Sequence, residues 1–398
     1  MITVRKLGVI GTVVLAVALA ACTSSTTTPP VASTTAASAT TSASAVSATT
    51  WWADSTWISP LVGWVLGEGK AGCAACLVIK TTVNGGRNWS AVPAPRGGLS
   101  VSSPQVCVRL GGCVGHLLFV NRHDGYLYGP ALFTTTDGGR TWRRQAGKQT
   151  EALATVAPGV VWRLAYDHDG CPGPCDVILQ QQRAGSTSWV TVRAPFDDKI
   201  TGVTPQIVST ATTRVLIVFY GNLASGFPSS ATFYITADRG RSWTTRIDPC
   251  GGGTGRASYE ATDTSAIGDG VVVVECLSKQ NSETKAFVLV SRDDGHAFGP
   301  RRPMPDPNAF MIAAATASTI VAATENVGGS GSFTYTLELS SDGGVHWRTV
   351  LRERETLTTM QGGSYLAFLS STVGHWIGYP DKLWTTTDAG RQWRISGL

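Results

Sequence analysis

The chain repeats one short phrase seven times, and this repeat constrains the fold more than any other feature. Six copies end in Trp and one ends in Phe. The copies are TTVNGGRNW (81–89), TTTDGGRTW (134–142), QQRAGSTSW (181–189), ITADRGRSW (235–243), VSRDDGHAF (290–298), LSSDGGVHW (339–347) and TTTDAGRQW (385–393). Their final aromatic residues are 53, 47, 54, 55, 49 and 46 residues apart. A nearly constant step of this length predicts radially repeated β-blades.

Each unit has the pattern of a four-stranded antiparallel meander. A β-rich run such as 77–79 precedes each phrase, and a short outer strand such as 142–144 follows it. An earlier strand begins and ends with glycine in three units, at 63–67, 125–129 and 374–378. Short strands between turn residues, with almost no 3.6-residue periodicity, predict an all-β fold. Seven units fill residues 51–398, so we expect a single seven-bladed β-propeller.

The phrase resembles the Asp box, whose pattern is Ser/Thr-x-Asp-x-Gly-x-Thr/Ser-Trp/Phe. An Asp or Asn side chain can accept hydrogen bonds from its own turn, glycine permits a positive φ, and the aromatic residue can fill the space between sheets. We therefore predict that the repeated acids are structural rather than catalytic. The predicted turn and packing residues are Asn84, Trp89, Asp137, Trp142, Trp189, Asp238, Trp243, Asp293, Phe298, Asp342, Trp347, Asp388 and Trp393. For a buried Trp142, truncation to alanine is expected to cost about 3–5 kcal/mol of stability.

The N-terminal segment predicts export. Arg5 and Lys6 precede an apolar run that closes with Leu19-Ala20-Ala21-Cys22, so residues 1–21 have the pattern of a signal peptide. The closing residues resemble a bacterial lipobox, which implies that Cys22 is lipidated and anchors the chain to the outer face of the cell membrane. Residues 22–50 are rich in Ser, Thr and Ala and carry no charge, so we expect a disordered tether.

Eight further cysteines occur as neighbours, which favours local structural disulfides in an exported protein. The predicted pairs are Cys73 with Cys76, Cys107 with Cys113, Cys171 with Cys175, and Cys250 with Cys276. We expect no metal site, because the CxxC motif at 73–76 has no second ligand pair. We expect no cofactor either, since the sequence has no G-x-S-x-G, H-E-x-x-H or P-loop motif.

The charge of the chain argues against nucleic acid as a partner. The formal net charge is +5, and removal of Arg5 and Lys6 with the signal peptide leaves +3. No block of Lys and Arg appears along the sequence. A protein that binds nucleic acid through its phosphates normally carries a basic patch or stripe.

The seven units, with a Gly-aromatic-x-x-Gly strand followed by a T-x-D-G-G-x-x-W turn, resemble propellers of the photosystem II stability/assembly-factor type. The resemblance covers roughly residues 51–398 and implies a scaffold that binds or chaperones other proteins. We therefore expect a monomeric, non-catalytic binding or assembly scaffold for a protein or glycan ligand at the cell envelope. Arg109, Arg163 and Tyr259 are candidates to line the mouth of the central channel.

The alternative is an exo-acting glycoside hydrolase, either sialidase-like or directed at a polysaccharide. Resemblance to sialidases would imply six blades and an early Phe/Tyr-Arg-Ile-Pro segment, which the sequence lacks. A hydrolase needs two carboxyl groups in different environments, and the candidates are Asp167, Asp169 and Glu260. Glu260 follows Tyr259, but adjacent residues of a strand point to opposite faces of the sheet.

Overall fold

The structure is a computed structural model, and its described residues belong to one compact unit. The described ranges are 50–69, 77–100, 112–166, 175–196, 199–200, 203–211, 214–221, 231–251, 257–268, 270–280, 283–328, 332–356, 365–378 and 382–398. Strands and turns make up this part of the chain. Within these ranges, no helix is long and apolar enough to cross a membrane.

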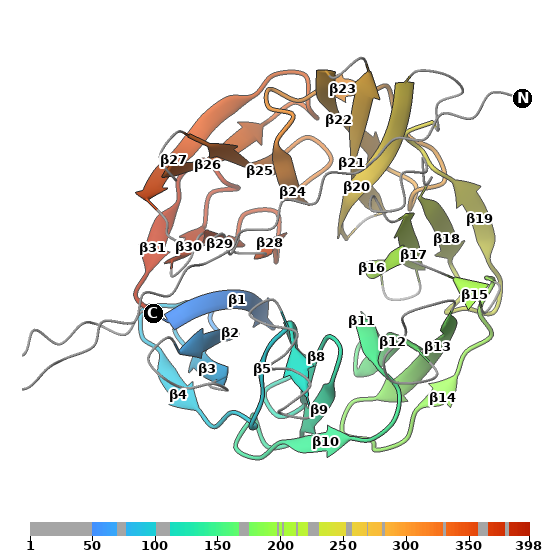
Figure 1. Ribbon diagram of the computed structural model, residues 1–398, viewed down its shortest axis with the longest axis vertical. Coiled ribbons are helices and arrows are strands. Elements are labelled where there is room, and N and C mark those ends of the chain that lie inside the picture. Colours follow the sequence, from blue (N-terminus) through green and yellow to red (C-terminus); the bar gives the residue numbers. More distant parts are fainter. Residues whose placement is uncertain are drawn as a thin grey trace, which may run out of the picture. The chain divides into compact units, whose positions relative to one another are not determined.

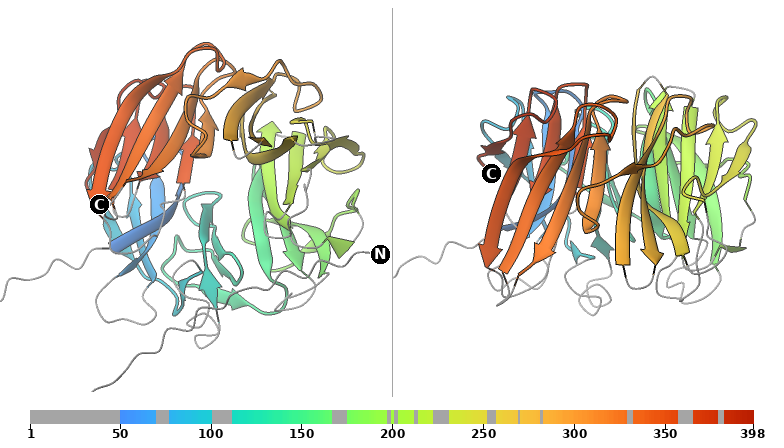
Figure 2. Two further views of the ribbon diagram at one scale, coloured as in Figure 1. Left: turned by 45° about the horizontal axis from the view of Figure 1, so that its top comes forward. Right: turned by 90° about the horizontal axis from the view of Figure 1, so that it is seen from above.

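The described chain forms a seven-bladed β-propeller, which confirms the fold predicted from the repeat (Figure 1). Each blade is an antiparallel meander in which consecutive strands are hydrogen-bonded neighbours, running from the middle of the ring to its rim. The views in Figure 2 show the blades side by side around the ring. The first described strand begins at Thr50, one residue before the predicted boundary of the propeller.

The strands of the blades fall into four classes by their distance from the middle of the ring. The innermost strands are β1 (Thr50–Trp57), β7 (His116–Phe119), β11 (Thr150–Ala157), β16 (Val203–Ala211), β20 (Ala257–Ile267), β24 (Ala309–Ala314) and β28 (Tyr365–Phe368). The second strands are β2 (Gly63–Gly69), β8 (Gly125–Tyr128), β12 (Val160–Tyr166), β17 (Arg214–Gly221), β21 (Val271–Gln280), β25 (Ile320–Val327) and β29 (Gly374–Gly378). The third strands are β3 (Leu77–Thr82), β9 (Leu132–Thr135), β13 (Cys175–Arg183), β18 (Thr232–Thr236), β22 (Glu283–Ser291), β26 (Ser332–Ser340) and β30 (Lys382–Thr386). The outer strands are β4 (Ser90–Val92), β10 (Arg143–Gln145), β14 (Val190–Thr191), β19 (Thr244–Ile247), β23 (Arg302–Pro303), β27 (Arg348–Thr356) and β31 (Arg394–Ser396).

Three short strands lie outside this pattern and were not predicted. β5 (Gly98–Leu99) pairs in parallel with β6 (Cys113–Val114) between the first two blades. β15 (Lys199–Ile200) pairs with the start of β13. The outer strand β27 also extends over nine residues, whereas the sequence predicted a short strand there.

The core lies between the blades, because each sheet has a neighbour on both faces. The adjacent residues Val65 and Leu66 are both fully buried, although they point to opposite faces of β2. Leu66 belongs to a cluster shared with Leu117 and Leu127 of the second blade. Val65 packs on the opposite side with Ile377 of the last blade. Burial on both faces explains why the second strands are continuous hydrophobic runs in several units.

The final aromatic residue of the repeated phrase packs at the boundary with the preceding blade. The indole N–H of Trp142 donates to the carbonyl of Pro93, at 2.9 Å, across the boundary between the first two blades. Trp243 donates in the same way to Arg193, at 3.2 Å, and its ring lies 5.9 Å from that of Trp162. These contacts couple neighbouring blades through both packing and hydrogen bonds.

The ring closes without a shared strand. All strands of the first blade come from residues 50–92, and all strands of the last blade come from residues 365–396. The joint therefore depends on side chains: Trp57 stacks on His375 with ring centroids 3.7 Å apart and planes at 2°. Trp89 meets Trp57 edge-on at 5.8 Å. We call this joint the closure seam.

One predicted disulfide is confirmed, because Cys250 and Cys276 are bonded and lie buried between the fourth and fifth blades. Cys113 is also in a disulfide, and its predicted partner Cys107 lies outside the described residues. Cys175 lies at the start of β13. The other predicted disulfide residues, Cys73, Cys76 and Cys171, fall outside the described ranges, as does Cys22.

Candidate functional site

The repeated turns hold their acidic residues through a fixed set of hydrogen bonds. In six of the seven turns a buried Ser or Thr hydroxyl donates to the Asp or Asn side chain, at 2.7–3.0 Å. The same hydroxyl accepts from a glycine N–H four residues later, at 2.8–3.0 Å. The acid or amide accepts a further backbone N–H, at 2.8–3.0 Å. The acids and amides involved are Asn84, Asp137, Asp238, Asp293, Asp342 and Asp388.

These hydrogen bonds favour the ionised form of the carboxyl groups. The hydroxyl and backbone N–H of Thr141 lower the pKa of Asp137 to about 2, and Ser242 does the same for Asp238. A general acid must hold a proton near the working pH, which such a carboxyl group cannot do. The repeated acids are therefore suited to fixing turns rather than to proton transfer.

A second recurring contact ties six of the seven repeated turns to their own blades. In five of these turns the fifth residue of the phrase donates its backbone N–H to a carbonyl at the turn between the first two strands, as from Gly138 to His123, at 2.9 Å. This residue has a positive φ, even where it is Arg239, Asp294 or Ala389. Both turns of a blade thus lie at the same end, and together they make the turn face of the propeller.

The third turn departs from the others, because its sequence, QQRAGSTSW, has no hydroxyl residue at the second position and no acid or amide at the fourth. Gln182 stands where the other turns have Ser or Thr, and its amide donates to the carbonyl of Ser186 at 2.7 Å. Its amide oxygen accepts from the hydroxyl of Tyr126 in the preceding blade, at 3.0 Å. A long amide side chain therefore replaces the hydroxyl and acid pair in this turn.

The innermost strands carry two aspartates that sequence reasoning missed. Asp54 on β1 accepts the N–H of Leu117 on β7, and Asp263 on β20 accepts the N–H of Ile312 on β24, each at 2.8 Å. Thr56 makes the same kind of contact with Phe119, at 3.3 Å. Strands β7 and β24 each form the edge of a sheet, so some of their N–H groups have no neighbouring strand to bond to. The side chains of the preceding blade accept hydrogen bonds from these N–H groups. We call the paired contacts edge clamps.

One edge clamp belongs to a cluster of titratable groups from three blades. The imidazole of His116 on β7 lies 3.5 Å from the carboxylate of Asp54 and stacks against Tyr128. Glu151 is the extra residue of a β-bulge in β11, between Thr150 and Ala152. Burial lowers the pKa of His116, but the contact with Asp54 and the charge of Glu151 outweigh this effect. The pKa of His116 is therefore raised overall. Burial also raises the pKa of Glu151.

Arg163 does not line a channel mouth, so that expectation was wrong. Its side chain is only 7 % exposed, and its guanidinium donates to the amide oxygen of Gln180 at 2.7 and 3.0 Å. It also lies 4.2 Å from the ring of Trp189. The amide oxygen and the aromatic face give the buried cation polar and cation–π partners, which accounts for its position inside the sheet.

The sequence-derived acid candidates are not brought together by the described part of the chain. Asp167, Asp169 and Arg109 lie outside the described residues. Glu260 and Tyr259 lie in β20, where their backbones pair with Leu277 and Ser278. Among the described residues, no group of three His, Cys, Asp or Glu side chains could hold a metal ion.

Four pockets lie at the boundaries between blades. One of about 470 Å³ lies between the first and second blades, and one of about 180 Å³ between the second and third. A third, of about 440 Å³, lies between the third and fourth blades, and a fourth, of about 610 Å³, lies beside the closure seam. Because these pockets occupy equivalent places around the ring, we call them the blade-boundary pockets. Each is lined by at least one arginine: Arg122 and Arg140, Arg143, Arg183 and Arg239, and Arg87 and Arg394, respectively.

The fold and these sites define a β-propeller with pockets between its blades. Comparisons with known proteins support this fold class and assign no activity. No protein-family model matches the sequence, and no curated protein matches it. A solved structure of a PL25 ulvan lyase bound to a glycan of GlcA(1-4)Rha3S matches with 9% identity and a TM-score of 0.50. The match covers 88% of this chain and 97% of that chain.

Two solved structures of YCF48 are also similar to this chain. YCF48 from Cyanidioschyzon merolae has 13% identity and a TM-score of 0.48, over 86% of this chain and 97% of that chain. YCF48 bound to D1 peptide has 17% identity and a TM-score of 0.43, over 70% of this chain and 79% of that chain. Both identities are below 25%, so these matches assign no activity to this chain.

Proposed function

We propose that this chain is an exported, lipid-anchored, monomeric propeller that acts as a non-catalytic scaffold for a protein or glycan ligand at the bacterial cell envelope. Export and anchoring rest on the N-terminal segment that ends at Cys22. The uncharged tether of residues 22–50 would hold the propeller away from the lipid surface. The ligand would contact a face of the propeller, where loops from several blades converge.

The observation that carries this proposal is the use of the repeated acids. Asp137 and Asp238 accept hydrogen bonds from the hydroxyl and backbone of the same turn, and their pKa is lowered to about 2. Acids held in this way build a rigid turn but lack the proton that glycoside hydrolysis requires of one carboxyl group. A rigid ring with pockets at its blade boundaries is the arrangement that a binding protein needs.

The competing function is glycoside hydrolysis, and a turnover screen separates the two. The full-length protein, purified in detergent, would be incubated with fluorogenic sialosides, envelope glycans and plant polysaccharides, and released sugars would be measured. The proposal predicts no turnover above a heat-denatured control.

Variants of the candidate acids test whether any turnover depends on one particular carboxyl group. Asp167→Asn, Asp169→Asn, Glu260→Gln and Glu151→Gln would be assayed beside the wild type. Turnover that any one of these substitutions abolishes, in a variant that keeps its circular dichroism spectrum, would overturn the non-catalytic proposal. A saturable ligand from detergent-solubilised envelope, recovered intact, would support it.

A further inference from the structure

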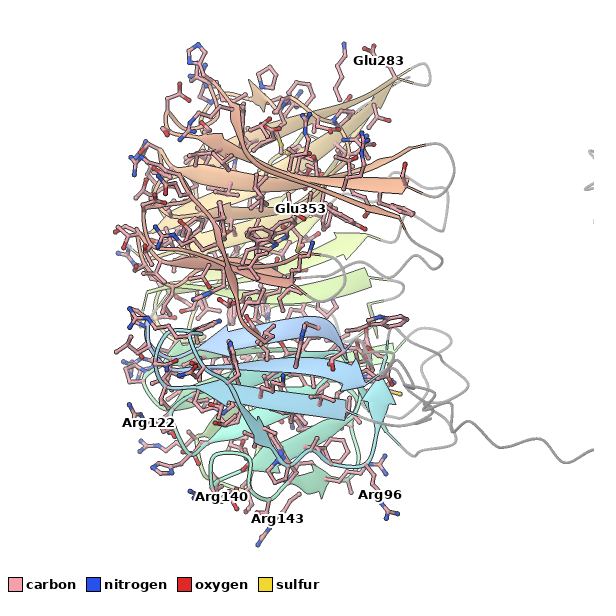
Figure 3. All side chains as sticks on the ribbon, turned by 90° about the vertical axis from the view of Figure 1, so that its left-hand side faces the viewer. Arg96, Arg122, Arg140, Arg143, Glu283 and Glu353 are labelled. Atoms are coloured by element: carbon pink, nitrogen blue, oxygen red, sulfur yellow. A yellow bond between two sulfur atoms is a disulfide. The ribbon has the colours of Figure 1, made fainter. Side chains whose placement is uncertain are left out.

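The pocket between the first and second blades combines an apolar wall with cationic side chains. Val83 and Val92 of the first blade lie on one side, and Val83 is 67 % exposed. Arg122 and Arg140 of the second blade lie on the other side, and both are exposed. Figure 3 labels these two arginines near one another, at the same end of the propeller. The volume of about 470 Å³ is within the range of roughly 300–1,000 Å³ that small-ligand sites occupy.

One residue that lines this pocket carries a buried donor for which the described residues supply no acceptor. Trp64 lines the pocket, is only 3 % exposed, and stacks on Phe119 with ring centroids 3.9 Å apart. Its indole N–H has no hydrogen-bond partner in the described part of the chain. A buried polar group without a partner costs stability, and an acceptor supplied by a ligand would remove that cost.

The other polar groups of the pocket also favour a ligand that accepts hydrogen bonds. Neither Arg122 nor Arg140 forms an ion pair with a described carboxylate. Asp137 is in the lining, but both of its oxygens are occupied by Thr135 and Thr141. Among the described residues, two guanidinium groups without a carboxylate partner, and a residue whose indole N–H is unsatisfied, therefore line the same pocket. Donors of this kind match a carboxylate better than a neutral hydroxyl group.

The recurrence of arginine-lined pockets points to a ligand with a repeating unit. All four blade-boundary pockets carry arginines, and all of these arginines are exposed. A peptide presents its acids in one particular order, whereas an acidic polysaccharide presents the same anion at every repeat. Several equivalent sites can engage such a polymer together, which raises its overall affinity.

We propose that the pocket between the first two blades binds a carboxylate-bearing sugar of an acidic polysaccharide, and that the other blade-boundary pockets add weaker contacts to the same polymer. Arg122 and Arg140 would bind the carboxylate, the indole N–H of Trp64 would donate to a ligand oxygen, and Val83 and Val92 would contact the sugar ring. This inference rests on the proposed binding function and specifies its ligand.

Binding of the full-length protein to polygalacturonate tests this inference, with dextran sulfate and neutral dextran as comparison polymers. We expect saturable binding of polygalacturonate and none of neutral dextran. The double variant Arg122→Gln/Arg140→Gln should bind polygalacturonate at least tenfold more weakly. Arg96→Gln is the matched control, because Arg96 is exposed at the other end of the propeller in Figure 3 and does not line the pocket.

The indole donor is tested separately. Trp64→Phe keeps an aromatic ring against Phe119 and removes the N–H, so binding should weaken roughly threefold to tenfold, the value of one hydrogen bond. Trp376→Phe is the matched control, since Trp376 also has an unpartnered indole N–H but packs in a different cluster. Equal losses for both variants would overturn the role of Trp64.

Other outcomes contradict the ligand class. Equal binding of neutral dextran, binding of dextran sulfate alone, or an equal loss in Arg96→Gln would overturn the carboxylate site. If no polymer binds while a protein or a different glycan is recovered intact from the envelope, this inference fails and the scaffold proposal stands. Shortening of polygalacturonate by the protein would instead overturn the scaffold proposal.

Discussion

The closure seam makes the stability of the propeller depend on pH through His375. Its imidazole is 1 % exposed between Trp57 and the last blade, and burial lowers its pKa from 6.5 to about 3. In the unfolded chain the same side chain binds a proton near pH 6.5. Above pH 6.5 the imidazole is neutral in both states, so its titration does not lower the free energy of unfolding. As the pH falls from 6.5 toward 3, protonation of the unfolded chain lowers the free energy of unfolding progressively.

The size of the effect follows from the shift in the pKa. One pKa unit corresponds to about 1.4 kcal/mol, so the full shift is worth about 5 kcal/mol. Between pH 7 and pH 5 the unfolded state gains about 2 kcal/mol from protonation of this residue. The pKa values of other groups, including His116 and Glu151, are also raised in the folded protein, so the test is a difference between two proteins.

The variant His375→Phe keeps a ring against Trp57 and removes the titration. Thr385 loses its contact with His375 but keeps its hydrogen bond to Ser396, at 2.9 Å, so the variant should still fold. Urea denaturation of both proteins, followed by circular dichroism, would be carried out at pH 7 and pH 5. We expect the wild type to lose about 2 kcal/mol more than the variant over this range. His123→Gln, which replaces an exposed imidazole, should behave as the wild type.

Equal pH dependence in the wild type and His375→Phe would show that His375 does not cause the loss of stability. It would mean that the imidazole is hydrated or charged in the folded protein. The stacked joint between the first and last blades would then need a different explanation.

Further predictions address the repeat, the disulfide and the anchor. Trp142→Ala should lower the free energy of unfolding by about 2–4 kcal/mol, because the half-buried ring and its hydrogen bond to Pro93 are lost; Trp142→Phe should cost less, and a loss below about 1 kcal/mol would contradict the packing role. The double variant Cys250→Ser/Cys276→Ser should lose about 3.5 kcal/mol in chemical denaturation, from opening a 26-residue loop, and no change would contradict this estimate. Cys22→Ser should move the protein from the membrane fraction to the soluble fraction, and continued sedimentation with membranes would argue against lipid anchoring.

The propeller could be predicted because each repeated turn is determined by residues that are close together in the sequence. A turn whose hydroxyl, acid and glycine bond to one another, as Thr135, Asp137 and Gly139 do, needs only a few consecutive residues. The same phrase occurs seven times at a nearly constant step, so the number of blades could be counted. The packing of Trp142 against the preceding blade follows from the same periodicity.

Contacts between blades were harder to predict, because they join residues about 50 or more positions apart. The edge clamp from Asp54 to Leu117 spans 63 residues, and its only local signal is an acid followed by two hydroxyl residues, as also occurs at 263–265. Arg163 was misplaced although its partners lie in the same blade. Gln180 is on the neighbouring strand β13 and Trp189 follows that strand, so the burial of Arg163 depends on strand pairing rather than on a local motif. The boundary pockets likewise combine side chains from two blades, so no single motif marks them.

The proposed function requires that this propeller binds a ligand without transforming it. The most direct measurement follows binding and product release together, by titrating the full-length protein with polygalacturonate and then analysing the polymer. We expect saturable binding that weakens at least tenfold in Arg122→Gln/Arg140→Gln, with the polymer length unchanged. Release of new reducing ends or unsaturated sugars by the wild type would contradict the proposed function.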